Sequence, residues 1–151
     1  MTGASKSLER IHFSPVDVLS QFKRLRSRTA GTSMLPSLRP GDILQIEACA
    51  AADAEVGNIV LFRSAGWLVV HRVNKCTAAG LVTQGDGLAR PDAPVAASDV
   101  LGRVIGVERH GRTVSHRPSR TLPLTRWLFG RSTLAARLFL RWHSATVRAS
   151  A

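Results

Sequence analysis

Apolar residues recur with two different periods along this chain, and the first period is helical. Between residues 15 and 25 the apolar positions are spaced as on one face of a helix: Val18, Leu19, Phe22 and Leu25. Ser14 can cap the start of this helix, and Pro15 suits its first position. We therefore predict a short helix over 15–25, with the basic residues of 23–28 along its flank.

Beyond residue 40 the pattern changes to the alternating or continuous apolar runs of β-strands. Five such runs are separated by Gly-containing turns and polar loops: 42–47, 59–62, 67–73, 81–84 and 100–108. The last run contains Gly102 and Gly106, at which we expect the strand to kink. Short strands at this spacing predict a mainly antiparallel β domain.

The helical period returns near the end of the chain. Residues 110–123 are rich in Arg, Ser, Thr and Pro and are interpreted as a linker. Residues 124–147 then combine an apolar stripe that includes Trp127 and Trp142 with arginines on the opposite arc. Such a segment is typical of an in-plane membrane anchor, and a helix packed on the protein's own sheet is the equal alternative.

Composition adds a strong positive charge to this picture. The chain has 151 residues, enough for one domain, and carries a formal net charge of +11. That excess favours an anionic partner: nucleic acid, a lipid surface or an acidic protein. Because no apolar run reaches the roughly 18 to 20 residues of a membrane span and no signal peptide is visible, we expect a cytoplasmic or peripherally membrane-associated protein. Two cysteines, Cys49 and Cys76, are too few for a metal site; we expect small buried thiols and leave a single disulfide open.

The loop from Gly31 to Asp42 is the first candidate for chemistry. Ser33 stands between small residues and Met34, and two prolines, Pro36 and Pro40, stiffen the segment that leads to the next strand. This composition suits an exposed nucleophile. It equally suits a Gly/Pro/Ser turn without a chemical role.

A serine hydroxyl needs a base within hydrogen-bond reach. Of the five histidines, His71 differs from the others because it lies in an apolar strand, where a structural role is the alternative. A carboxylate should orient the imidazole, and Asp86 and Asp92 both follow the run 81–84. Ordinary turn chemistry would also explain these two aspartates.

Five short motifs occur together in the order found in one protein family. They are Ser33-Met34-x-Pro36 with Gly41-Asp42, Gly57-Asn58-Ile59-Val60, Val70-His71-Arg72-Val73, Thr83-Gln84-Gly85-Asp86 with Asp92, and Gly102-Arg103-Val104. Over roughly residues 29 to 108 the chain resembles the signal peptidase I family. Histidine in the third motif is similar to the archaeal and endoplasmic-reticulum branch. The bacterial branch and the related LexA-type self-cleaving repressors have lysine there.

The resemblance implies a serine endopeptidase that requires no metal or organic cofactor. It assigns Ser33 as nucleophile, His71 as general base and Asp92, with Asp86 as the alternative, as the acid that orients the ring. The Ser33 backbone N–H would stabilise the oxyanion. The residues implied in substrate or oxyanion binding are Gly31, Thr32, Met34 and Pro36. Two positions depart from the family's pattern, Gln84 for its usual Lys and Gly87 for its usual Asn.

These expectations divide the chain into three parts. Residues 1–28 would form a tail and a short helix, 29–115 a signal-peptidase-like catalytic β domain, and 116–151 a basic linker with an amphipathic helical tail. The expected partners are a peptide or protein substrate and an anionic membrane surface that binds residues 124–147. Two other functions stay open: an inactive binding or accessory domain of the same fold, and a LexA-like DNA-associated regulator. DNA is not expected, because the part before Ser33 is too short for a helix-turn-helix domain.

Overall fold

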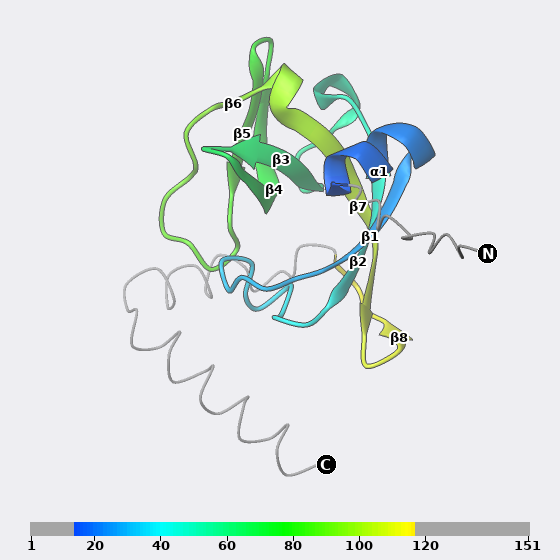
Figure 1. Cartoon of the computed structure of the whole chain (residues 1–151). Helices are drawn as coiled ribbons and strands as arrows, with labels where there is room; N and C mark the ends of the chain where they lie inside the picture. The colour runs from blue at the N-terminus through cyan, green and yellow to red at the C-terminus, as the bar shows by residue number, and fades with distance from the viewer. Residues whose placement is uncertain (1–13, 117–151) are drawn as a thin grey trace, which may run out of the picture.

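One antiparallel sheet forms most of the described protein (Figure 1). The computed structural model describes residues 14–116. The strands are β1 (Arg24–Arg28), β2 (Ile43–Ala48), β3 (Ile59–Ser64), β4 (Trp67–Thr77), β5 (Gly80–Gln84), β6 (Val95–Ala96), β7 (Val100–Arg109) and β8 (Arg112–Thr113). They follow the order β1-β2-β7-β3-β4-β5-β6, with β8 paired to β7. The prediction of a mainly β fold is confirmed, whereas the predicted helical tail at 124–147 lies outside the described residues.

The only α-helix among residues 14–116 is α1 (Pro15–Phe22), which begins where predicted. Ser14 Oγ accepts from the Asp17 N–H, and the Asp17 side chain accepts from the Ser14 N–H, both at 3.2 Å. The helix ends earlier than predicted, because Lys23 has a left-handed φ of 61° and its N–H closes on the Leu19 carbonyl.

The basic residues after the helix lie on a strand, which corrects the predicted helical flank. In β1, Leu25 and Ser27 are half-buried, while Arg24, Arg26 and Arg28 are exposed. The strand pairs with β2 in register. The sheet therefore begins within residues 1–28, the part expected to hold only a tail and a short helix.

The central strand β3 is buried on both faces, as its continuous apolar run predicted. Ile59 and Leu61 belong to a core cluster with residues of α1, β2 and β7, whereas Val60 and Phe62 belong to a second cluster with residues of β4 and β5. The two clusters lie on opposite faces of β3, since successive side chains alternate across a strand. Both faces of this strand thus support the rest of the sheet.

β7 shows irregularities beside the two glycines at which a kink was expected. The register to β2 shifts between the partners of Gly106 and Val104, and the register to β3 shifts next to Gly102. The expected linker begins later than residue 110, because His110 and Gly111 form the turn that returns β7 into β8. Residues 117–123 of that linker lie outside the described part.

Both cysteines are free. Cys49 is half-buried, and desolvation by burial raises the pKa of its thiol. Cys76 is exposed, so the expectation of a buried thiol is wrong there; its Sγ lies 3.3 Å from the Ala54 carbonyl oxygen. Within residues 14–116, no helix has the length and apolar character needed to cross a membrane.

Candidate active site

The fold brings three of the predicted site residues into one hydrogen-bonded line. Ser33 Oγ lies 2.9 Å from His71 Nε2, and His71 Nδ1 lies 2.7 Å from Asp92 Oδ2. A carboxylate only accepts hydrogen bonds, so the neutral ring carries its proton on Nδ1. The lone pair of Nε2 then faces the serine hydroxyl, which is the arrangement a general base requires.

The imidazole is held in place by its strand. His71 is buried on β4, opposite Val60 of β3, and the Phe62 ring meets the imidazole edge-on with centroids 6.1 Å apart. A buried ring with both nitrogens engaged has little freedom to turn. His71 therefore presents Nε2 to Ser33 in a fixed direction.

Asp92 is fixed through both its backbone and its side chain. Its N–H donates to the Thr83 carbonyl at 2.9 Å, and Thr83 Oγ1 donates to Asp92 Oδ2 at 2.7 Å. Thr83 is fully buried on β5. The loop that leaves β5 thus returns to the same strand at the residue that contacts His71.

Ser33 lies in a loop that is anchored by apolar side chains. Met34 and Leu38 are buried in the core, and turn hydrogen bonds run from Leu35 N–H to the Thr32 carbonyl and from Leu38 N–H to the Met34 carbonyl. The peptide bond between Leu35 and Pro36 is cis. The loop consists of tight turns whose apolar side chains are buried in the core, so the core beneath the loop defines the position of Ser33.

A second loop secures the serine from the other side. The Gly87 N–H donates to the Ser33 carbonyl at 2.8 Å. A Cβ on Gly85 would lie only 2.5 Å from that same carbonyl oxygen, and one on Gly87 would lie 3.1 Å from the Leu35 oxygen. Only glycine at 85 allows this approach, and the approach brings the Gly87 N–H into contact with the serine carbonyl.

The second candidate carboxylate occupies a different place. Asp86 is fully buried and forms an ion pair with Arg72, with Nε–Oδ1 at 2.9 Å and Nη2–Oδ2 at 2.7 Å. Arg72 also donates to the Gly57 and His116 carbonyls. Asp92 therefore faces His71, and Asp86 ties β4 to the loop that contacts Ser33.

The remaining predicted residues surround Ser33. Gly31 and Thr32 are exposed and Pro36 is half-buried. Within residues 14–116, no acceptor is bound by the Ser33 backbone N–H. That donor is therefore directed to no other group of the described chain.

An apolar groove of about 360 Å³ runs past the serine. Its lining includes Leu25, residues 27–31 and residues 68–70 of β4. The buried core side chains that also line it are Met34, Leu38, Leu44, Ile46 and Leu61. Most of the groove's lining residues are apolar, and Ser33 is one of them.

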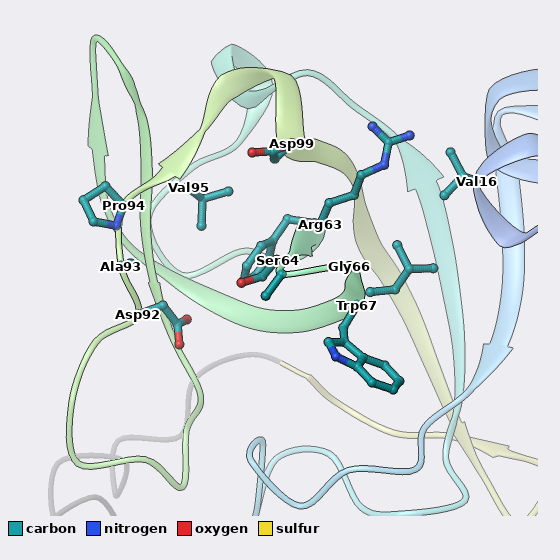
Figure 2. Close-up of a pocket in the computed structure, with 13 residues that line it drawn as sticks. Val16, Arg63, Ser64, Gly66, Trp67, Asp92, Ala93, Pro94, Val95 and Asp99 are labelled. Atoms are coloured by element: carbon teal, nitrogen blue, oxygen red, sulfur yellow. The ribbon is translucent and has the colours of Figure 1, made fainter.

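A second depression, of about 590 Å³, lies on the Asp92 side (Figure 2). It is lined by Asp92 to Val95 and by the turn between β3 and β4, where Trp67 is 76% exposed. Leu68 lines both this depression and the apolar groove. The Asp92 side chain is 23% exposed, so water reaches this end of the hydrogen-bonded line.

Three residues of the site stand within the motifs quoted from the sequence but were given no role there. Thr83 and Arg72 are polar side chains in apolar strands, a pattern that signals a buried partner. Gly85 precedes the Asp86 turn, and its close approach to Ser33 depends on the path of two loops. In the described part of the chain, no three His, Cys, Asp or Glu side chains cluster as metal ligands would.

Comparisons with protein families, with curated proteins and with solved structures find no match to this chain.

Proposed function

We propose that this protein is a serine endopeptidase of the signal peptidase type. The observation that carries the proposal is the line from Ser33 Oγ through the His71 ring to Asp92 Oδ2, with 2.9 Å and 2.7 Å between successive polar atoms. Serine nucleophiles are recognised by this geometry and these roles in unrelated folds. The resemblance of the five motifs to the signal peptidase I family also supports the proposal, because Ser33, His71 and Asp92 each belong to one of these motifs.

In the proposed reaction, Ser33 Oγ attacks the scissile carbonyl while His71 Nε2 takes the hydroxyl proton. Asp92 holds the ring in the required tautomer and stabilises the imidazolium that forms. His71 then returns the proton to the leaving amine, and an acyl-enzyme remains on Ser33. Water, activated by the same imidazole, hydrolyses this ester and restores the hydroxyl.

The negative charge on the tetrahedral intermediate would be stabilised by the Ser33 backbone N–H. No group within 14–116 competes for this donor. Removing a single oxyanion donor from a serine peptidase costs roughly 10²- to 10³-fold in rate. A preorganised backbone donor would thus account for a large part of the catalysis.

The substrate would be an extended peptide with small or apolar side chains. One edge of β4 pairs with β3 along residues 67–72. The other edge pairs with β5 only from Arg72 to Thr77, so at this second edge residues 68–70 have no strand partner in the described chain. A peptide added along this edge would form backbone hydrogen bonds and place alternate side chains in the apolar groove. Ser33 lines that groove, beside the peptide's path.

We further propose that the protein acts in the cytoplasm or at a membrane surface, with residues 124–147 bound to anionic lipid. The net charge of +11 supports attraction to such a surface. Full-length protein should pellet with anionic vesicles at low salt and not with neutral ones. A failure to pellet would contradict this part of the proposal.

A serine-directed fluorophosphonate probe tests the enzyme directly. The wild type and Ser37→Ala, a change in the same loop, should be labelled, whereas Ser33→Ala should not. Circular dichroism should show all three folded. Absence of labelling in the folded wild type would favour an inactive binding domain, and salt-dependent binding to duplex DNA would favour the regulator.

A further inference from the structure

A third depression lies where the serine loop joins the sheet, and three arginines and two carboxylates line it. It encloses about 330 Å³ between the end of β1, residues 39–43 and the turn from β7 to β8. Its charged lining residues are Arg28, Arg39, Asp42, Glu108 and Arg109, and His110 also lines it. None of the proposed catalytic residues lines it, although Arg28 lines both this depression and the apolar groove.

Both acidic side chains in this depression already have cationic partners. Arg109 donates from Nε to Asp42 Oδ1 at 2.8 Å and from Nη2 to Asp42 Oδ2 at 2.7 Å. Asp42 Oδ2 also accepts a hydrogen bond from the Arg39 backbone N–H. Glu108 binds Arg26 at 2.6 Å and accepts from Gln45 at 2.6 Å. In each of these two ion pairs the carboxylate charge offsets a guanidinium charge. The other two lining arginines, Arg28 and Arg39, therefore have no carboxylate of the depression left to pair with.

Arg28 and Arg39 form no ion pair with any residue of 14–116. Arg28 makes one long contact, 3.5 Å, to the Gly41 carbonyl. Arg39 is half-buried, its Nε is inaccessible to solvent, and no residue of 14–116 accepts a hydrogen bond from this Nε. A partly desolvated guanidinium without a counter-charge is costly, and an anion would remove that cost.

We propose that this depression binds a phosphate group. Its two uncompensated guanidinium groups match the nearly two negative charges of a phosphate monoester at neutral pH. Arg28 and Arg39 come from different segments and can hold different oxygens of a tetrahedral anion, and guanidinium forks suit phosphate oxygens. Free phosphate and the headgroup of phosphatidic acid share this chemistry.

The surrounding backbone is built firmly enough to hold such a site. The Thr29 N–H donates to the Asp42 carbonyl and the Gly41 N–H to the Thr29 carbonyl, both at 2.8 Å, while Thr29 Oγ1 donates to the Arg39 carbonyl. Arg109 also contacts the Ser37 carbonyl. The two chain segments that carry Arg28 and Arg39 are therefore fastened to each other.

The test uses full-length protein, titrated with potassium phosphate against potassium chloride at matched ionic strength. Thermal midpoints and calorimetry give the dissociation constant, and flotation measures binding to phosphatidic acid and phosphatidylcholine vesicles. Phosphate should stabilise the wild type and the control Arg63→Gln, an exposed arginine remote in sequence. Arg28→Gln and Arg39→Gln should each weaken phosphate binding about tenfold.

Each arm distinguishes a source of the phosphate. Phosphate binding that depends on Arg28 and Arg39, with vesicle binding unaffected by either change, identifies a free phosphate ligand. Vesicle binding that depends on both arginines without a phosphate effect identifies the lipid headgroup. If all four proteins respond alike to phosphate and to vesicles, the proposal is wrong. Arg28 is exposed, so Arg28→Gln keeps the test valid should Arg39→Gln fail to fold.

Discussion

Thr83 Oγ1 donates a 2.7 Å hydrogen bond to Asp92 Oδ2, the same oxygen that faces His71 Nδ1. The strand that ends before the site therefore supplies a buried hydroxyl that fixes the carboxylate, and the carboxylate fixes the ring. Because the Asp92 N–H also returns to the Thr83 carbonyl, these two residues form a closed contact through backbone and side chain.

Thr83→Val should slow probe labelling of Ser33 about tenfold while the fold stays intact. The change keeps the shape of the side chain and removes one hydrogen bond, which is worth about 1.5 kcal/mol to a charged acceptor and corresponds to about tenfold in rate. Labelling rates by gel fluorescence measure this effect. Thr113→Val, on the exposed strand β8, is the control and should label at the wild-type rate. Equal labelling rates for Thr83→Val and Thr113→Val would show that the Thr83 hydroxyl does not support the reactivity of Ser33.

Asp92→Asn should lower the labelling rate by roughly 10³-fold or more with little loss of stability. An amide can donate to Nδ1, which favours the wrong tautomer and turns the protonated nitrogen toward Ser33. Asp92 is partly exposed, so its replacement leaves no buried charge behind. Rapid labelling of Asp92→Asn would show that the carboxylate does not orient the imidazole.

Arg72 and Asp86 should govern stability. Asp86→Asn leaves the buried Arg72 guanidinium without its counter-charge and should lower the free energy of unfolding by about 3 to 5 kcal/mol. The double variant Arg72→Met/Asp86→Leu removes both charges and should recover much of that loss. Urea unfolding of the wild type, the single variant and the double variant measures the difference. If Asp86→Asn leaves the free energy of unfolding unchanged, the ion pair between Arg72 and Asp86 is not buried as described.

The sequence pattern predicted five of the eight strands, β2, β3, β4, β5 and β7, and singled out Ser33 and His71, and it failed where two periods overlap or where loop paths decide. β3 was predictable because four consecutive apolar residues need a strand buried on both faces. The helix was extended too far because Leu25 fits both helical spacing and the alternation of β1 with Ser27. Spacing could not choose between Asp86 and Asp92, since both belong to one loop. The return of the Asp92 N–H to Thr83 makes that choice in the fold.

Gly85→Ala should impair both the labelling of Ser33 and the stability of the fold. The added Cβ would lie 2.5 Å from the Ser33 carbonyl oxygen, so one loop must move away from the other. We expect a labelling rate at least about tenfold lower and a free energy of unfolding lower by about 1 to 3 kcal/mol. Gly31→Ala is the matched control for stability, because a Cβ there meets no atom within 4 Å. Equal unfolding midpoints for the two variants would argue against the close contact.

Glu108 should contribute to a loss of stability in acid. Its pKa lies below the ordinary value of about 4.5, first because Gln45 donates to its carboxylate and also because Arg26 binds it. The folded protein therefore binds this proton less readily than the unfolded chain does, so the contribution is complete above the ordinary pKa and is lost as the pH falls through the lower, folded value. Glu108→Gln should consequently be less stable than the wild type near neutral pH, and the difference should narrow as the pH falls below the ordinary pKa of about 4.5 and through the lower, folded value. Urea midpoints at each pH measure the difference, with Glu55→Gln, an exposed residue of the loop before β3, as control. A difference between wild type and Glu108→Gln that is constant with pH would show that the contacts to Gln45 and Arg26 do not favour the charged carboxylate.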